Sequence, residues 1–394
     1  MGSSLRCQEP APKHDQNDIT WGILGCGRVS ADFCEAFRNV SNRKIVACAA
    51  SRSRRRAVAF GQRYGILAKR CYGSYEELCS DEAVQVIYIA TMHSFHKEHA
   101  LMALKAGKHV LIEKPMGMSA DEAKVIIVAA RQRGLFLMEG VWTRCFPAVR
   151  EARRLLARGA IGRVTSVFAD YGKRVPPHRR TDPVLGRGAT TDMGIYPIAS
   201  AAMAFGGLGL PSRVAAAGVL DQKTRIDVAA SVSLVYGDRE TASIHYSKLA
   251  NTPEETRYVG TEGVITLNPG IGVNTTAISP EKGRRRSSHC LGFFQDNDII
   301  IDTLRAMLTW PKRSSSAFVK DEQNRQSIHW TSLSRSVAQT VDSVLRALGV
   351  TFGKSRRQEI ERATSHPEDP RSLVEIELSA PPLYCNDEYS ECER

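Results

Sequence analysis

The sequence lacks an apolar run long enough to cross a membrane. No such run approaches the roughly 20 residues that a transmembrane helix requires. Residues 1–18 are polar and carry no apolar stretch of the kind found in signal peptides. Arg6 stands where the myristoylation pattern requires Ser or Thr, so lipid attachment at Gly2 is not expected. We therefore expect a cytoplasmic protein with no membrane partner.

Paired cysteine spacings and nucleic-acid recognition motifs are also missing. The 10 cysteines are scattered from Cys7 to Cys392, which predicts reduced, mostly buried thiols and neither a disulfide framework nor a metal site. The net charge of +12 is dispersed, apart from Arg52 to Arg56 and Lys282 to Arg286. We expect no nucleic-acid partner, because anionic cofactors attract the same charge.

The chain of 394 residues suits two domains. Across residues 19–140, short apolar runs alternate with helical patterns, which is typical of βαβ units. We expect this part to form an α/β domain with a doubly wound parallel sheet, after a disordered tail at residues 1–18. The predicted strands are Ile19 to Leu24, Lys44 to Ala50, Val84 to Ala90, Val110 to Ile112 and Phe136 to Met138.

Longer strand patterns follow Gly162 and predict an α+β domain with an open, mainly antiparallel sheet over residues 141–353. Gly237-Asp238 is a hairpin signal between two of these strands. One face of the segment Val228 to Tyr236 carries mainly small residues, and it either supports a dimer or faces solvent. The predicted strands are Val164 to Tyr171, Arg213 to Val219, Val228 to Tyr236, Glu240 to Leu249 and Arg257 to Leu267.

The remainder of the chain is more polar. From Asn274 to Gln326 the composition predicts a surface loop, a helix at Ile299 to Trp310 and another loop. Helical periodicity returns from Leu333 to Leu348, and Gly349 is placed to end that helix. Residues 354–394 are charged with few apolar clusters, so we expect a disordered tail.

Gly25-Cys26-Gly27 follows the first predicted strand and precedes a helical pattern. This arrangement matches the start of a dinucleotide-binding fingerprint, in which glycines let the backbone approach a pyrophosphate. Ser30 replaces the third glycine. Glycines also end strands for purely structural reasons, but the place of this pair at the start of a βαβ series favours cofactor binding.

Ser51-Arg52 ends the second strand, where an NAD enzyme usually carries Asp or Glu for the ribose hydroxyls. Arg52 would hold a 2′-phosphate as a bidentate donor, with Ser51 beside it. The alternative is a solvated basic start of a helix, which the helix dipole disfavours. The pattern therefore predicts NADP(H) as the cofactor.

Two further motifs carry candidate chemistry. Glu113-Lys114-Pro115 lies just past a strand, at the edge where doubly wound domains bind ligands. Asp192 and Tyr196 are spaced i and i+4, so they would share one face of an α-helix. Lys114 and Tyr196 suit acid/base work with Asp192 in support. The plainer alternatives are a solvated lysine and an aspartate helix cap beside a packed tyrosine.

These motifs, in this order, resemble the Gfo/Idh/MocA oxidoreductase family. The match covers most of residues 19–270 and is most specific at Thr91 to His96 and at Ala106 to Pro115. Tyr196 in place of the commoner histidine, together with Phe136 to Arg144, resembles the branch of dimeric dihydrodiol dehydrogenases and NADP-dependent D-xylose dehydrogenases.

The resemblance implies an NADP-binding Rossmann domain at residues 19–140 and a substrate and dimerisation domain at residues 141–353. It implies that Lys114 and Tyr196 face the reacting carbon, with Asp192 in support. It places Trp142, Arg144 and Lys173 with Tyr196 at the substrate. The expected cofactor contacts are Gly25, Gly27, Arg28, Ser51, Arg52, Thr91, His93, His96, Glu113 and Lys114.

The sequence therefore predicts an NADP-dependent dehydrogenase that acts on a trans-dihydrodiol or an aldopentose such as D-xylose, as a homodimer. Two features depart from the family pattern. Arg187 to Thr191 replaces the usual approach of glycines and leucines to Asp192, and residues 275–330 fit poorly. The competing hypothesis is therefore an inactive NADP-binding sensor or scaffold.

Overall fold

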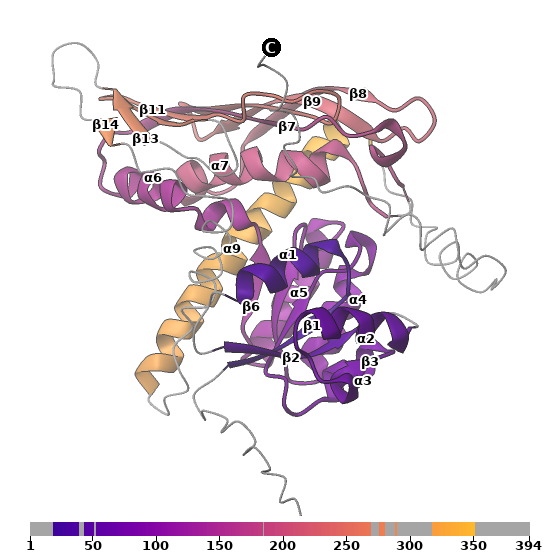
Figure 1. Cartoon of the computed structure of the whole chain (residues 1–394). Coiled ribbons are helices and arrows are strands. Elements are labelled where there is room, and N and C mark those ends of the chain that lie inside the picture. Colours follow the sequence, from indigo (N-terminus) through magenta and orange to yellow (C-terminus); the bar gives the residue numbers. More distant parts are fainter. Residues whose placement is uncertain are drawn as a thin grey trace, which may run out of the picture.

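The computed structural model describes residues 19–38, 43–50, 53–183, 185–268, 276–279, 288–289 and 317–350. Several predictions lie outside these residues: the two tails, Ser51, Arg52 and the helix at Ile299 to Trp310. The described chain forms two layered parts, one around a parallel sheet and one around a large mixed sheet (Figure 1).

The first part is a six-stranded parallel sheet with the order β3-β2-β1-β4-β5-β6. This order is that of a dinucleotide-binding doubly wound fold, so the predicted fold class is confirmed. Its strands are β1 (Ile19–Leu24), β2 (Arg43–Ala49), β3 (Cys71–Tyr72), β4 (Val86–Ile89), β5 (His109–Glu113) and β6 (Leu137–Gly140). Its helices are α1 (Arg28–Phe37), α2 (Arg54–Arg63), α3 (Tyr75–Ser80), α4 (His96–Lys105) and α5 (Ala120–Gln132).

The second part is an open sheet with the order β14-β13-β12-β11-β7-β10-β9-β8. Its pairs are antiparallel except for β7 with β10, which confirms the prediction of a mainly antiparallel sheet. The helices α6 (Pro147–Ala157) and α7 (Ile195–Phe205) cover one face (Figure 1). The strands are β7 (Val164–Gly172), β8 (Arg213–Leu220), β9 (Asp227–Tyr236), β10 (Glu240–Ser247), β11 (Thr256–Gly260), β12 (Val264–Leu267), β13 (Thr276–Ser279) and β14 (Ser288–His289).

Two predicted elements were wrong in extent. The single strand Arg257 to Leu267 is a hairpin of β11 and β12, because the chain reverses at Thr261 to Gly263. The helix α9 (Ala317–Ala347) begins within the segment that was expected to be a loop up to Gln326. Lys, Glu, Gln and Arg at positions 320–326 are good helix formers, so a polar composition there did not mean a loop.

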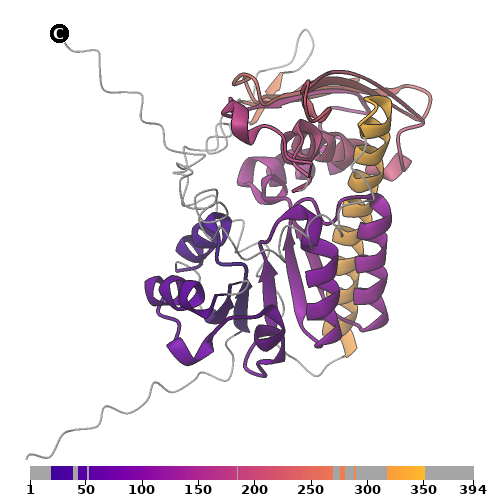
Figure 2. The ribbon, with the colours of Figure 1, turned by 90° about the vertical axis from the view of Figure 1, so that its right-hand side faces the viewer.

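Helix α9 ties the two parts together, as Figure 2 shows. Its apolar residues Val337, Val341 and Val344 are buried. It also bonds to α5: Asp342 accepts a hydrogen bond of 2.9 Å from the Ala120 amide, and Arg131 donates to Thr331 over 3.1 Å. These contacts fix the second sheet and α7 against the carboxyl edge of the parallel sheet. No helix in the described ranges has the length and apolarity needed to span a bilayer.

Candidate active site

The turn after β1 is built for close approach of an anion. Gly25 has φ of +99°, and a Cβ there would lie 3.0 Å from the Ala90 carbonyl oxygen, so only glycine fits without strain. Buried Ser30 donates its hydroxyl hydrogen to the Gly25 carbonyl, so the residue in place of the third glycine ties the turn to α1. Gly27 is the N-cap of α1, has no side-chain cap, and faces open space. The first amides of α1 therefore suit a pyrophosphate.

The basic segment after β2 is only partly available to a cofactor. Ser53 caps α2 by accepting a hydrogen bond from the Arg56 amide. Arg54 donates to the carbonyl oxygens of Cys71 and Ala68, each over 3.2 Å, so it has a structural role. The assignment of a 2′-phosphate to Ser51 and Arg52 stays a prediction.

Buried imidazoles connect the loops that follow β4 and β5. His96 lies 2.7 Å from the Pro115 carbonyl oxygen through Nδ1 and 3.0 Å from that of Thr91 through Nε2. Thr91 Oγ1 and His99 Nδ1 are 2.9 Å apart. Burial lowers the pKa of all three histidines of this segment, of His93 to about 3 and of His99 to about 4. His93 and His99 are therefore neutral at pH 7.

Carboxylates hold the backbone on both sides of Lys114. Glu113 accepts a hydrogen bond of 2.7 Å from the Tyr88 hydroxyl and another from the Lys114 amide. Burial raises the pKa of Glu113, which these hydrogen bonds oppose. Glu139 at the end of β6 accepts a hydrogen bond of 2.8 Å from the Met116 amide. The Lys114 side chain is thereby directed out of the sheet edge toward the second sheet domain.

Lys114 meets the residues of the second motif. Its Nζ donates a hydrogen bond of 2.8 Å to the backbone carbonyl of Asp192. The same Nζ lies over the ring of Tyr196, 5.1 Å from its centroid. The Asp192 carboxylate accepts a hydrogen bond of 2.5 Å from Lys248 on one oxygen, and the other oxygen is 3.9 Å from His93 Nδ1. The structure thus brings together Lys114, Asp192, Tyr196 and His93.

Asp192 does not lie on an α-helix, which corrects the expected shared face. Thr190 to Gly194 form a π-helical turn, and α7 starts only at Ile195. The turn is pinned at its start, because buried Asp227 accepts hydrogen bonds from the Thr190 amide at 2.6 Å and hydroxyl at 2.7 Å. A π-turn is wider than an α-turn, so i and i+4 spacing does not define one face. Asp192 also caps neither this turn nor α7.

The charges around Asp192 set its ionisation. Burial raises its pKa, but the nearby Lys248, His93 and Lys114 outweigh burial and hold the pKa well below its usual range. Burial lowers the pKa of Lys114, and the carboxylates of Asp192 and Glu113 oppose this effect. The carboxylate is therefore ionised at neutral pH, next to a lysine that gives up its proton more readily than a solvated one.

The residues expected at the substrate have mixed surroundings. Trp142 is half-buried, with its ring 6.0 Å from that of Phe146. Arg144 is only 6% exposed and contacts Ser334 of α9 over 3.4 Å. Lys173 pairs with Glu254 at 2.7 Å. A small pocket next to Tyr196 is lined by Thr143, Phe146, Val149, Asp170, Tyr171, Pro197, Ser200, Glu254, Thr256 and Leu267.

Two family models match the chain. Residues 19–141 match the oxidoreductase family with an NAD-binding Rossmann fold, and residues 149–266 match the GFO/IDH/MocA C-terminal domain. The chain belongs to the Gfo/Idh/MocA oxidoreductase family. It is therefore an NAD(P)-binding oxidoreductase, as the resemblance in its motifs predicted.

Curated relatives match about three quarters of their own length to this chain. The trans-1,2-dihydrobenzene-1,2-diol dehydrogenase of Bos taurus is 40% identical over 252 residues, which cover 63% of this chain and 74% of the relative. The Homo sapiens enzyme of the same name is 37% identical over 255 residues, with coverage of 64% and 75%. These relatives support a dehydrogenase that acts on CH–OH groups.

Two solved structures have the same fold as this chain. An aldose-aldose oxidoreductase from Caulobacter crescentus, complexed with glycerol, superposes with a TM-score of 0.71 at 21% identity, covering 84% of this chain and 98% of that one. A 3-ketoreductase from Actinomadura kijaniata, in complex with NADP and TDP-benzene, gives 0.68 at 24% identity with the same coverage. At these identities the likeness concerns the fold alone.

Sequence reasoning missed Lys248, which directly follows β10. Its side chain is 1% exposed, and its Nζ donates to the Arg180 carbonyl over 2.6 Å as well as to Asp192. A signal was present, because Ala242, Ile244 and Tyr246 alternate toward the buried face and Lys248 continues that alternation. A lysine at an inward position needs a buried partner, so it marks a site.

Proposed function

We propose that this protein is an NADP-dependent dehydrogenase that transfers a hydride between the nicotinamide and a carbinol or hemiacetal carbon of a small polyhydroxylated substrate. The observation that carries the proposal is the meeting of Lys114, Asp192 and Tyr196 at the carboxyl edge of the parallel sheet. Ligands of doubly wound domains bind at that edge. Lys114 comes from one motif of the sequence and Asp192 and Tyr196 from another, 78 residues further on, so their convergence is a property of the fold.

The residues present fit a dinucleotide. Gly25 and the uncapped N-terminus of α1 at Gly27 form an anion cradle, with Arg28 in the first turn. Thr91 and His93 lie between β4 and α4, His96 begins α4, and Glu113 and Lys114 follow at the end of β5. These positions suit the nicotinamide half. A bound nicotinamide supplies the hydride acceptor or donor, and a preference for NADP rests on Ser51 and Arg52.

Tyr196 and Lys114 are the residues that carry out proton transfer in this proposal. In the oxidative direction the substrate hydroxyl gives its proton to the Tyr196 oxygen as the carbon loses its hydride. The ammonium of Lys114, held over the Tyr196 ring, stabilises the phenolate that accepts this proton. The Asp192 carbonyl fixes Lys114 in that position. Trp142, Arg144 and Lys173 are proposed to bind the substrate.

The proposed substrates are trans-dihydrodiols of arenes and aldopentoses such as D-xylose. The relatives named trans-1,2-dihydrobenzene-1,2-diol dehydrogenase support the first class. The Caulobacter crescentus protein of the same fold is an aldose-aldose oxidoreductase, which accords with the second class.

A fluorescence titration with NADPH and NADH, followed by a panel of dihydrodiols and aldopentoses with the oxidised cofactors, tests the proposal. We expect tighter NADPH binding and turnover of at least one panel member. The variant R52D should reduce the preference for NADPH over NADH by about 10-fold or more, because a bidentate phosphate contact is lost. Cofactor binding without turnover on any member would favour a sensor, and no binding would refute the assignment of Gly25 and Gly27.

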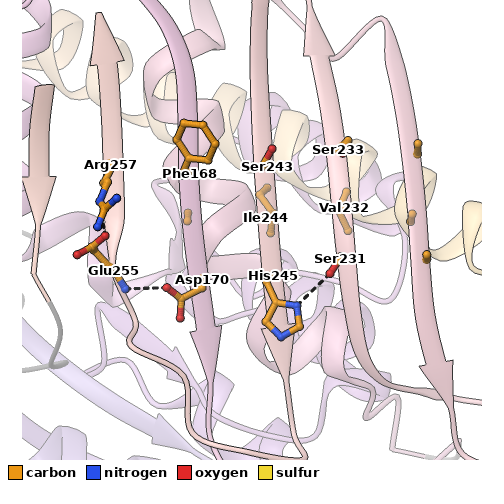
Figure 3. Close-up of a pocket in the computed structure, with 14 residues that line it drawn as sticks. Phe168, Asp170, Ser231, Val232, Ser233, Ser243, Ile244, His245, Glu255 and Arg257 are labelled. Atoms are coloured by element: carbon orange, nitrogen blue, oxygen red, sulfur yellow. Dashed lines mark hydrogen bonds and ion pairs between the residues drawn. The ribbon is translucent and has the colours of Figure 1, made fainter. Parts of the chain in front are cut away.

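We further propose that two copies associate through the face of the second sheet that α6 and α7 leave open. Figure 3 shows this face, with Phe168, Ser233, Ser243 and His245 projecting from neighbouring strands. Phe168 is 49% exposed, which suits an interface better than solvent. In sedimentation velocity, wild type and V125R on α5 should be dimers and S233R a monomer. A wild-type monomer would refute this proposal.

A further inference from the structure

Lys248 is a buried ammonium whose contacts are unlike those of a surface lysine. Its Nζ is held between two acceptors, the Arg180 carbonyl at 2.6 Å and the Asp192 carboxylate at 2.5 Å. Its side chain is 1% exposed. Burying a charge costs several kcal/mol unless it is paired, so the geometry of this pair is under strong constraint. Asp192 links this pair to Lys114, because the Lys114 ammonium donates a hydrogen bond to the backbone carbonyl of the same Asp192.

We propose that Lys248 is a positioning residue for hydride transfer, which holds the Asp192 carboxylate on the sheet side so that Asp192 presents only its backbone carbonyl to Lys114. The inference rests on the proposed function, because the proposed function assigns Asp192 and Lys114 their roles in proton transfer. It adds the residue that follows β10 to a site otherwise assigned to the β5 edge, the π-turn and the start of α7.

The charges around Lys114 explain why such a residue matters. Burial lowers the pKa of Lys114, Asp192 and Glu113 raise it, Lys248 lowers it, and Glu139 raises it. Asp192 faces Lys248, His93 and Lys114, and Arg187 also acts on His93. Among the described residues, Lys114 is the other ammonium that acts on this carboxylate, and it would remain without Lys248. A direct carboxylate pair would keep Lys114 protonated and draw it away from the Tyr196 ring.

Hydrogen bonds of buried residues next to this pair hold the strand and the turn in place. Tyr246, two residues before Lys248 on the same face of β10, shares a hydrogen bond of 2.6 Å with Thr190 at the start of the π-turn. Thr190 in turn bonds to buried Asp227. The same strand therefore fixes both the turn that carries Asp192 and the cation that holds its side chain. Loss of the contact between Lys248 and Asp192 should therefore move the Asp192 side chain and leave the turn that carries it in place.

A double-mutant cycle of K248M and D192N tests the inference, with kcat and KM measured against pH on a substrate that wild type turns over. We expect K248M to lower kcat about 10-fold or more at pH 7, with KM within about 3-fold, and to move the pH profile to higher pH. D192N/K248M should be no slower than D192N, because Lys248 acts through that carboxylate. K248R, which keeps the charge, should retain the wild-type pH profile.

Lys108 offers a matched control. It is also buried, at 9% exposure, and its Nζ donates to the carbonyls of Asp81 and Val84 over 2.8 Å each, but no carboxylate in the described part of the chain accepts from it. K108M should lose stability without a change in the pH profile of kcat. Additive effects in the cycle, or the same pH profile in K248M and K108M, would overturn the inference.

A second readout separates this inference from the proposed function. Lysine side-chain NMR of the ligand-free protein, with K114M to assign the signal, measures the pKa of Lys114 without any substrate. We expect this pKa to be higher in K248M than in wild type, and an unchanged or lower pKa would overturn the inference. If K248M does not fold, two other comparisons still test the inference. The pH profile of K248R is compared with that of wild type, and the kcat of D192N/K248M is compared with that of D192N. A wild type that turns over nothing refutes the proposed function alone.

Discussion

The half of the site built by the parallel sheet and the half built by the mixed sheet hold their polar side chains in different ways. On the parallel side, partly buried His93 and buried His99 are neutral, because burial lowers their pKa. On the mixed side, buried Lys248 forms a charged pair with partly exposed Asp192. Neutral groups suit a surface that receives a cofactor, and a fixed charge pair suits control of proton transfer next to it.

The same two halves differ in how far apart their partners lie in sequence. His96, Thr91 and Pro115 are within 24 residues of one another, on loops that follow adjacent strands. Asp192 and Lys248 are separated by 56 residues and meet only because of the sheet topology. Substitutions should therefore produce local effects in the first half and effects at a distance in the second.

The largest expected effect concerns the residue where the two halves meet. Replacing Lys114 in K114M should lower kcat about 1000-fold, since general acid/base groups contribute roughly 100- to 10,000-fold. NADPH affinity should remain within about 3-fold of wild type. Steady-state kinetics and fluorescence titration check this, with K108M as the buried-lysine control. A kcat within 10-fold of wild type would remove Lys114 from the chemistry.

A pH experiment tests whether the first half is neutral. The pKa of His99 falls to about 4 in the folded protein, against about 6.5 in an unfolded chain. The unfolded chain therefore binds a proton first as pH falls, so stability decreases from about pH 6.5 down to about pH 4. Urea unfolding should show about 2 kcal/mol of this loss between pH 7.5 and pH 5 in wild type, and H99Q should lack it.

The exposed His178 provides the control for that experiment, because H178Q leaves the buried imidazoles in place. H178Q should follow the wild-type decline in stability with pH. A stability difference between H99Q and wild type that is equal at pH 7.5 and pH 5 would show that His99 is not buried as a neutral ring.

The smallest expected effects separate the two glycines of the anion cradle. G27A places a methyl group in open space, so the melting temperature should not change while NADPH binding weakens about 10-fold. G25A forces a Cβ onto a backbone with φ of +99° and against Ala90. It should cost about 1–2 kcal/mol of stability as well as affinity. Thermal melts and titrations check both, and equal melting temperatures would contradict the distinction.

Much of the parallel half could be predicted from the sequence because each functional residue follows an apolar strand. Gly25 after β1, Thr91 after β4 and Lys114 after β5 all lie at one edge once the sheet order is known. The mixed half was only partly accessible. The open sheet and the strand β9 followed from alternation, but the π-turn at Thr190 to Gly194 did not. That turn begins at Thr190, which is held by hydrogen bonds to Asp227, 37 residues away.

Lys248 shows the same limitation more clearly. The alternation in β10 predicts that Lys248 points inward, but it does not predict Asp192 as the partner. That salt bridge depends on where α7 packs against the sheet. The start of α9 was hidden for another reason, since polar helix formers without an apolar period resemble a loop in composition. In both cases tertiary packing supplied what local pattern lacks.

The account rests on Tyr196 as the proton acceptor beside Lys114, and single-turnover kinetics of Y196F test that most directly. Absorbance at 340 nm would follow reduced-cofactor formation with the best dihydrodiol or aldopentose, and NADPH affinity would be measured in parallel. We expect a rate about 1000-fold below wild type with NADPH affinity within about 3-fold. A Y196F rate equal to that of wild type would contradict the mechanism.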